Sequence, residues 1–525
     1  MLGIKPKVDY LRRHIPECIF GLYCLLVGLA SVASTTLGGN KFGVVLFYTL
    51  VFYSVYTLVP ITKKYVVQLH FYPSENVSLR KCFKVFLLCC VTSLAILGIV
   101  WAGVFPGVFS PDPFAQIKQV VEGHYNDWHP VLHTLLFFTL PMKVTGSLNA
   151  IVPFQIICFS LFVGCLGVFS YRFAGKNFTL FSVGVILLSP FTLSILMNPW
   201  KDVGFAIAAA MSMLWTIDIY FDNKVGILKI VFLSLFLVAA TFLRHNGILF
   251  TLPLLLGIFF VVNKKSFLML CCCSVFCYAA VNVSYRYIGV EKPGGRVIET
   301  MGFALSVITN VAKECPQCLN AETKEFVDRL FAPQPNWRNN HDISGFNSVK
   351  FLGIDGDVVE NAGRVKILKM MGSCIWSAPV ASLKTISVMT AVVWGIEKYC
   401  DFSIDAEYNS GNNGVVPIRK IVKGYTTLVS YTPLKFIFCS IGFSIIIVLA
   451  FILFKSDFTQ KSAWRKILLC VPILVYDFGT MLFLSGDNIR FFYVNQLVFP
   501  MIILLMAGQK LPKSNNRFLS ENLNQ

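Results

Sequence analysis

Residues 83–105 read FKVFLLCCVTSLAILGIVWAGVF, an apolar run in which Lys84 is the only charged residue. A helix rises about 1.5 Å per residue, so a run of this length crosses the roughly 30 Å of hydrocarbon in a bilayer. The run lacks the strict alternation of apolar and polar residues that strands of a membrane barrel show. It therefore predicts a transmembrane helix.

The rest of the chain has the same character. Of its 525 residues, 56% are hydrophobic and 14% are charged, whereas about 25% of the residues in a soluble domain are charged. We therefore expect an all-α, polytopic helical membrane protein with about twelve transmembrane helices. The predicted spans are 15–37, 42–62, 83–105, 149–171, 178–196, 203–221, 226–243, 247–262, 266–288, 434–454, 466–484 and 489–508.

Basic residues set the expected orientation, because cytoplasmic loops of membrane proteins are enriched in lysine and arginine. Here they gather before the first span and in alternate connections, whereas segment 289–433 is nearly neutral. We expect a multi-pass protein of the cell membrane with both termini in the cytoplasm. The net charge of +18 is then mostly a topology signal, and nucleic acid is not an expected partner.

Two apolar segments are predicted not to span. Residues 129–144 are too few and contain two prolines, and residues 375–396 are broken by a proline and a lysine. Counting 129–144 as a span would also move Arg172 and Lys176 to the outside. We expect a helix there that lies on the outer surface or re-enters the membrane.

The expected domain organisation follows from these spans. It comprises an N-terminal transmembrane module of about nine spans (1–288) with an outer catalytic loop (106–148), an extracytoplasmic cap (289–433), a C-terminal transmembrane module of about three spans (434–510) and a cytoplasmic tail (511–525).

Polar motifs gather at the predicted outer ends of the spans, and no comparable group is expected at the inner ends. Ionisable groups near hydrocarbon are costly and usually face a bundle interior or a wet cavity, so they are functional candidates. The five motifs are Asp112–Gln116, Asn126–His133, Asn198–Asp202, Arg244–Gly247 and Gly486–Arg490.

Two carboxylates in these motifs are the candidate catalytic residues. Asp112 stands between Pro111 and Pro113, which predicts a stiff, extended backbone and suits a general base that must be held in position. Asp127 is the second candidate. Each aspartate can instead be the N-cap of a helix that follows it; for Asp112 that helix is 114–122.

The other motif residues are candidates for substrate or phosphate binding. Lysine binds phosphate as a point charge and arginine as a bidentate donor. The predicted binding residues are His129, His133, Lys201, Asp202, Arg244, Asn246 and Arg490. The structural alternatives are a Lys201–Asp202 ion pair, snorkelling of Arg244, and an ion pair of Arg490 with Asp477 or Asp487.

His129 and His133 are four residues apart, which is metal-ligand spacing on a helix. Two histidines alone are a weak metal signal, so we predict that they hydrogen-bond or contact an anionic head group. No metal ligand is assigned, and a divalent cation is left open as a cofactor.

Most of the 17 cysteines lie in or beside apolar runs, where free cysteine behaves as a small hydrophobe. Cys315 and Cys318 are expected to form a local disulfide in an oxidising outer compartment. Cys374 and Cys400 are candidates for a second pair, although sequence does not fix connectivity.

The motif order resembles a known pattern. It runs Pro-Asp, His-Pro-x-x-His-Thr, Lys-Asp-Val, Arg-x-Asn-Gly and Asp-x-x-Arg-Phe, within residues 83–260 and 466–500. The pattern resembles that of a poorly characterised family of bacterial multi-span proteins. That family is similar to the GT-C superfamily of membrane glycosyltransferases, which includes protein O-mannosyltransferases and the aminoarabinose transferase of lipid A.

The resemblance implies a polyprenyl-phosphate-linked sugar as donor and an essential aspartate in the first large outer loop, which Asp112 matches. It also implies that basic residues at outer helix ends hold the donor phosphate, as Lys201, Arg244 and Arg490 would. The sequence departs from the superfamily in two respects: the loop follows the third span rather than the first, and Pro113 stands where an acidic neighbour is common. Asp127 therefore remains an alternative base.

The leading hypothesis is an inverting glycosyltransferase that moves a sugar to an envelope glycan, lipid or protein acceptor on the outer face of the membrane. A flippase or exporter of lipid-linked glycans also needs cations in a cavity, but such transporters often show repeated halves, which this sequence lacks. An oligosaccharide polymerase, with a diphosphate-linked donor, is the third hypothesis.

Overall fold

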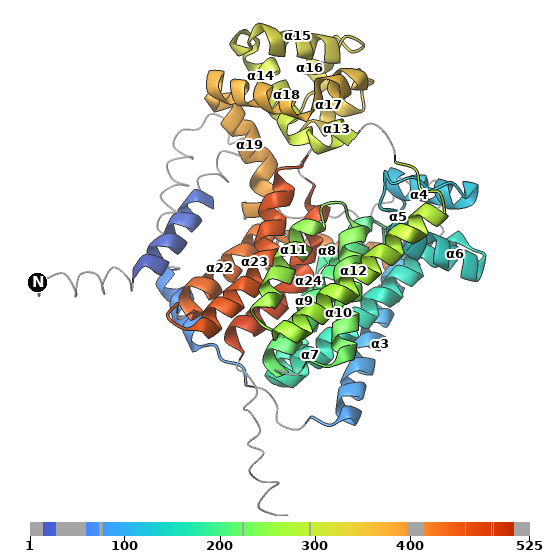
Figure 1. Cartoon of the computed structure of the whole chain (residues 1–525), viewed down its shortest axis with the longest axis vertical. Helices are drawn as coiled ribbons and strands as arrows, with labels where there is room; N and C mark the ends of the chain where they lie inside the picture. Colours follow the sequence, from blue (N-terminus) through green and yellow to red (C-terminus); the bar gives the residue numbers. More distant parts are fainter. Residues whose placement is uncertain are drawn as a thin grey trace, which may run out of the picture.

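The computed structural model describes residues 14–27, 59–72, 77–222, 225–292, 296–395, 414–456, 458–484, 486 and 488–508. Within these ranges the regular structure is helical, apart from two isolated β-bridges. The predicted all-α class is therefore confirmed for the part of the chain that the structure describes (Figure 1).

After a first helix at His14–Val27, the elements follow in a long series. They are α3 (Leu79–Gly103), α4 (Pro111–Glu122), α5 (Val131–His133), η1 (Thr134–Thr139), α6 (Leu140–Thr145), η2 (Leu148–Ala150), α7 (Ile151–Leu187), α8 (Pro190–Ile195), α9 (Lys201–Asp222), α10 (Ile227–Leu243), α11 (Ile248–Phe259), α12 (Lys264–Tyr287), α13 (Arg296–Thr300), α14 (Gly302–Glu314), η3 (Pro316–Cys318), α15 (Ala321–Leu330), α16 (Trp337–Asn340), α17 (Asn347–Lys350), α18 (Gly356–Ser377), α19 (Pro379–Trp394), α20 (Val416–Ser430), α21 (Leu434–Cys439), α22 (Ile441–Lys455), α23 (Lys461–Met481), η4 (Ile489–Phe492) and α24 (Tyr493–Ala507).

Among the described residues, five helices are long and apolar enough to cross a membrane, or six if α18 and α19, bent by 118°, form one span. The five are α3, the stretch Leu148–Leu187, α9, α12 and the stretch Ile489–Ala507. A helical membrane protein is thus supported, whereas twelve spans stay a prediction. Most of the predicted span 42–62 lies outside the described residues.

Helix α7 consists of two antiparallel helical segments, one before and one after Gly175. Gly175 has a φ of 76° and interrupts the helical backbone, a conformation that glycine adopts without a Cβ penalty. The Ser182 hydroxyl donates to the Ser170 hydroxyl at 2.9 Å, and Gln155 Nε2 donates to the Leu196 carbonyl at 3.0 Å. The chain therefore folds back at Gly175, where the two predicted spans 149–171 and 178–196 meet.

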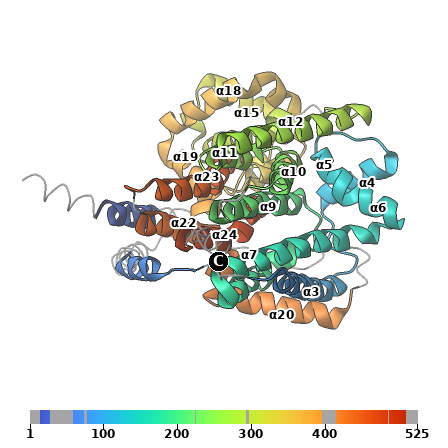
Figure 2. The ribbon, with the colours of Figure 1, turned by 60° about the horizontal axis from the view of Figure 1, so that its bottom comes forward.

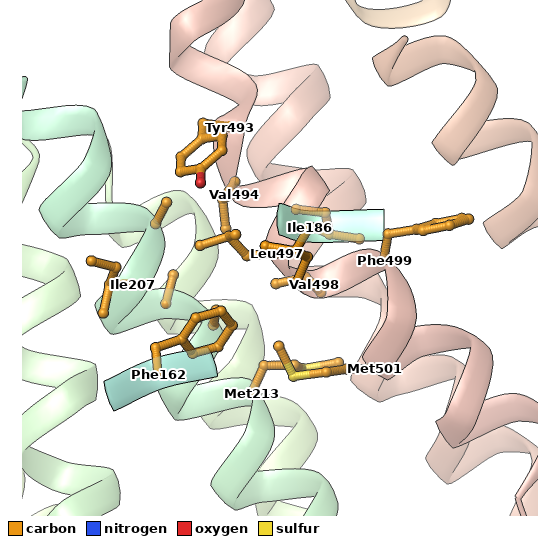
Figure 3. Packing of buried hydrophobic residues seen from close by; sticks show 14 of the residues in the cluster. Phe162, Ile186, Ile207, Met213, Tyr493, Val494, Leu497, Val498, Phe499 and Met501 are labelled. Atoms are coloured by element: carbon orange, nitrogen blue, oxygen red, sulfur yellow. The ribbon is translucent and has the colours of Figure 1, made fainter. Parts of the chain in front are cut away.

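The core lies around α9 and α24, which are almost completely buried. Small residues such as Ala209 and Ala210 on α9 allow neighbouring helices to approach closely. Phe162 from α7, Ile207 from α9 and Leu497 from α24 meet in this core (Figure 3). By contrast, α12 is largely exposed, as expected of a helix that faces lipid.

A separate hydrophobic core holds the cap, which contains α13 to α18 and lies at one end of the bundle (Figure 1). Leu305, Val359 and Met370 are buried in it. The predicted disulfide between Cys315 and Cys318 is present. Cys374 is a buried free thiol, and Cys400 lies outside the described residues. Helix α19 connects the cap to the bundle, where it packs against α22 and α23 (Figures 1 and 2).

The two segments predicted not to span behave differently. Residues Val131–Thr145 form one apolar helical stretch with a π-helical middle, and it is too short to be a candidate span. The second segment, predicted at 375–396, covers the end of α18 and the whole of α19. The complete helices α18 and α19 together qualify as one bent span or a re-entrant loop.

Candidate functional site

The five sequence motifs meet at the cap end of the bundle, with His129 of the Asn126–His133 motif 3.5 Å from Lys201. Asp112 lies in the first turn of α4, Lys201 and Asp202 begin α9, Arg244 follows α10, and Arg490 lies in η4. Backbone contacts fix this arrangement, because the Val108 N–H donates to the Met197 carbonyl at 2.8 Å. The segment between α3 and α4 is thereby held against the turn that precedes α9.

Helix α4 starts three residues earlier than expected, so the extended backbone predicted for Asp112 is wrong. Ser110 is the N-cap, and Pro111 and Asp112 lie in the first turn. The first residues of a helix have no intrahelical partner for their N–H groups, so prolines are tolerated there. Asp112 is not the N-cap residue, although its carboxylate lies at the positive end of the helix.

Asp112 pairs with Arg490 across the site. Arg490 Nη2 donates to Asp112 Oδ2 at 3.1 Å, and the carboxylate keeps about a third of its surface exposed. Burial raises the pKa of Asp112, but the positive charges of Arg490 and Lys201 outweigh burial and hold that pKa below its ordinary value. Asp112 is therefore an ionised, partly accessible carboxylate.

Asp202 neutralises the interior of the site. Its carboxylate is 1% exposed and forms an ion pair with Arg244, and Arg490 Nε lies 3.7 Å from its second oxygen. One buried carboxylate thus serves two guanidinium groups, which would otherwise repel each other in a medium of low dielectric constant. The three cations of the site (Lys201, Arg244 and Arg490) exceed its two carboxylates (Asp112 and Asp202) by one, so the cluster carries one net positive charge.

Two aromatic rings hold the arginines in place. The Arg244 guanidinium lies 4.3 Å from the Phe491 ring centroid, and the Arg490 guanidinium lies 4.7 Å from the Trp200 ring centroid. Trp200 Nε1 in turn donates to the Ser110 hydroxyl at 2.7 Å. Such cation–π contacts orient a guanidinium and partly replace its water. Trp200 and Phe491 both stand in the sequence motifs, but their contacts with the arginines are not predicted from sequence.

The turn after α10 is built around Gly247. A Cβ at this position would lie 2.2 Å from the Ala240 carbonyl oxygen, so only glycine fits. The turn presents Asn246, whose Oδ1 accepts from Arg244 Nε at 2.5 Å and whose Nδ2 donates to the Thr480 hydroxyl at 2.8 Å. Asn246 therefore links Arg244 to Thr480 of α23 and helps to hold the guanidinium group in position.

The two histidines have different environments. His129 is buried, and its Nδ1 lies 3.5 Å from Lys201 Nζ. Burial and the Lys201 charge lower the pKa of His129 to about 4, so the ring is neutral at pH 7. His133 instead binds Gln116 Oε1 through Nδ1 at 2.8 Å. Across the described residues no group of three or more histidine, cysteine or acidic side chains could hold a metal ion.

A cavity of about 370 Å³ opens beside this cluster. Its polar wall comprises Lys201, Arg244, His245 and Asn246, its apolar wall comprises Ile248, Leu249, Phe483 and Phe491, and Glu299 and Thr300 of the cap with Thr480 complete it. Pockets that are mostly apolar with a few convergent polar groups are typical ligand sites. This one suits a molecule with an anionic head and a hydrocarbon tail.

Asp127 lies at the edge of this region. Its backbone N–H donates to the Glu291 carbonyl at 2.9 Å, beside a bridge between Asn126 and Glu291. Asp477 accepts from Asn495 at 2.7 Å, and among the described residues the carboxylates that pair with Arg490 are Asp112 and Asp202. Asp487 lies outside the described residues.

A second charged cluster occupies the opposite end of the bundle, which corrects the expectation that no comparable group exists there. Arg172 bonds to Asp218 at 2.6 Å and to Asp222 at 2.9 Å, and Lys229 pairs with both carboxylates. Two cations and two anions balance, and every member is paired. This cluster fits a structural ion-pair network that joins α7, α9 and α10.

Comparison of the chain with protein-family models, with curated proteins and with solved structures finds no match. The site is therefore interpreted from its own geometry.

Proposed function

We propose that the chain is a GT-C-like membrane glycosyltransferase. It would move a sugar from a polyprenyl-phosphate donor to an envelope glycan, lipid or protein acceptor. The site would open on the outer face of the cytoplasmic membrane, with both termini in the cytoplasm.

One observation carries this proposal: the 370 Å³ cavity joins a cationic wall to an apolar wall. Lys201 and Arg244 offer charge-assisted hydrogen bonds to a phosphate, whereas Leu249 and Phe483 offer a surface for hydrocarbon. Asp202 holds the net charge of the site near +1, so the site attracts a phosphate without accumulating unpaired positive charge.

The chemistry follows from the position of Asp112. Its ionised carboxylate takes the proton of an acceptor hydroxyl, and the acceptor oxygen forms a bond to the anomeric carbon of the sugar. The bond between that carbon and the phosphate oxygen breaks, and its electron pair leaves with the lipid phosphate. Lys201, Arg244 and Arg490 stabilise the charge that develops there.

The direct test is sugar transfer by the purified full chain in liposomes that contain polyprenyl-phosphate-linked sugars. A positioned general base contributes about 10²–10⁴-fold to the rate, so Asp112→Asn should reduce transfer by at least about 10²-fold. Asp328→Asn, an exposed carboxylate of the cap, is the matched control and should leave transfer unchanged.

Full transfer by Asp112→Asn and by Asp127→Asn would rule out general-base catalysis by either residue. Movement of the lipid-linked sugar across the bilayer without transfer would instead identify a flippase.

A further inference from the structure

A second cavity of about 290 Å³ lies beside the first part of the outer loop. Four residues on one face of α4 line it, and the loop that follows α4 supplies the rest. The lining residues are Ala115, Lys118, Gln119, Glu122, His124, Asn126, Trp128 and His129. It is distinct from the first cavity, with which it shares no residue.

The chemistry of this lining differs from that of the first cavity. Ala115 and Trp128 are its only apolar members, so a hydrocarbon chain would bury little surface there. Lys118 faces Glu122 at 3.8 Å, so an anion would meet a carboxylate as well as a cation. Neither a lipid tail nor a phosphate is the matching ligand.

What the cavity does offer is an aromatic face with planar polar groups beside it. Trp128 is 40% exposed, and its backbone N–H donates to Asn126 Oδ1 at 3.1 Å. Gln119 Nε2 donates to the same oxygen at 3.2 Å. The two amides therefore fix the loop that carries the indole. A sugar ring presents C–H groups on its faces, which pack on an aromatic ring, and hydroxyls at its rim, which bond to amides and carboxylates.

His129 connects the two cavities. It lines the second cavity, while its Nδ1 lies 3.5 Å from Lys201 Nζ, which lines the first. The His129 Nε2 makes no hydrogen bond to any residue that the structure describes. A hydroxyl held in the second cavity beside His129 is therefore separated from Lys201 and the first cavity by the His129 ring.

We infer that the second cavity binds a sugar ring of the acceptor, so that the acceptor is a glycan rather than a peptide or a lipid. The assignment of this sugar as the acceptor rests on the proposed function. The binding of a sugar to this cavity does not rest on the proposed function, because saccharide binding can be measured without any transfer reaction.

The test uses the purified full chain on an array of neutral and N-acetylated mono- to tetrasaccharides. Two variants address the cavity: Trp128→Ala removes the aromatic face, and Ala115→Phe fills the space from an exposed position of α4. Trp376→Ala is the matched control, because Trp376 is an exposed tryptophan of α18. Wild type and Trp376→Ala should bind the same saccharides, and each cavity variant should bind them about tenfold more weakly or worse.

Two results would overturn the inference: no saccharide retained by the wild type, or equal binding by the wild type and both cavity variants. Transfer to a peptide or lipid that is unaffected by Trp128→Ala would also overturn it, while leaving the proposed function intact. Saccharide binding that depends on Trp128, without transfer from any lipid-phosphate donor, would instead support the cavity and contradict the proposed function.

Discussion

Arg490 Nη2 donates to Asp112 Oδ2 at 3.1 Å, although 378 positions separate the two residues. The bond joins α4 to η4, at the start of the last helical stretch. Because Arg490 Nε also lies 3.7 Å from Asp202, one guanidinium group links the partly exposed carboxylate of Asp112 to the buried carboxylate of Asp202. This pair of contacts therefore forms only when α4, α9 and η4 are packed together in the folded protein.

The acid limb of the pH–rate profile should depend on Arg490. Burial raises the pKa of Asp112, and the charge of Arg490 is the largest influence that lowers it. Arg490→Gln removes that influence, so Asp112 should become protonated at a higher pH and transfer should be lost at a higher pH on acidification. Arg338→Gln, in the cap, should leave the profile unchanged. An unaltered acid limb in Arg490→Gln would show that Asp112 is not the titrating base.

Asp202→Asn should strongly destabilise the protein. The substitution leaves Arg244 and Arg490 buried without their shared counter-ion, and breaking a buried ion pair costs about 3–5 kcal/mol. Glu322→Gln is the control, because Glu322 and Lys366 form a solvent-exposed pair worth at most about 1 kcal/mol. Thermal unfolding in detergent measures both variants. Similar small shifts for the two would contradict the buried pairing.

Gly247→Ala should abolish binding of farnesyl phosphate, a soluble analogue of the donor. The new Cβ would lie 2.2 Å from the Ala240 carbonyl oxygen, so the turn must move and carry Arg244 and Asn246 away from the cavity. Gly372→Ala is the matched control, since nothing lies within 4 Å of a Cβ there, and alanine is favoured over glycine inside a helix by about 0.5–1 kcal/mol. Equal affinities in the two variants would disprove a role for the turn in phosphate binding.

His129 should make stability depend on pH in the acidic range. Its pKa of about 4 in the folded protein is below the ordinary value of about 6.5. The unfolded chain therefore binds a proton between these pH values while the folded protein does not, and stability should fall as pH falls through this window. His129→Asn should make that decline shallower, and His70→Asn, an exposed histidine, should not. Thermal unfolding at several pH values decides between these outcomes.

The helical membrane class could be predicted because hydrocarbon permits few alternatives to apolar helices. The convergence of Asp112, Lys201, Arg244 and Arg490 was also predictable, since each stands at an end of an apolar run. Their pairing was not, because the partner of Arg490 depends on how α4 packs beside η4. Asp477, an expected partner, bonds to Asn495 instead, whereas Asp112 and Asp202 lie beside Arg490 although they are far from it in sequence.

Other expectations failed for identifiable physical reasons. His129 precedes the helix that begins at Val131, so the four-residue spacing to His133 does not place both rings on one helix face. The sequence does not indicate the ion-pair network of Arg172 with Asp218 and Asp222, because it places Arg172 in a connection, whereas Arg172 lies within α7 beside α9. Trp200 and Phe491 contact the arginines through ring faces, which sequence spacing does not encode.

The most direct measurement is a cryo-electron microscopy structure of the full chain with undecaprenyl phosphate. We expect phosphate density in contact with Arg244 and Lys201, with the lipid chain against Leu249 and Phe483 in the 370 Å³ cavity. Density for the phosphate beside Arg172 and Lys229 at the opposite end of the bundle, or no density in this cavity at saturating lipid, would contradict the account.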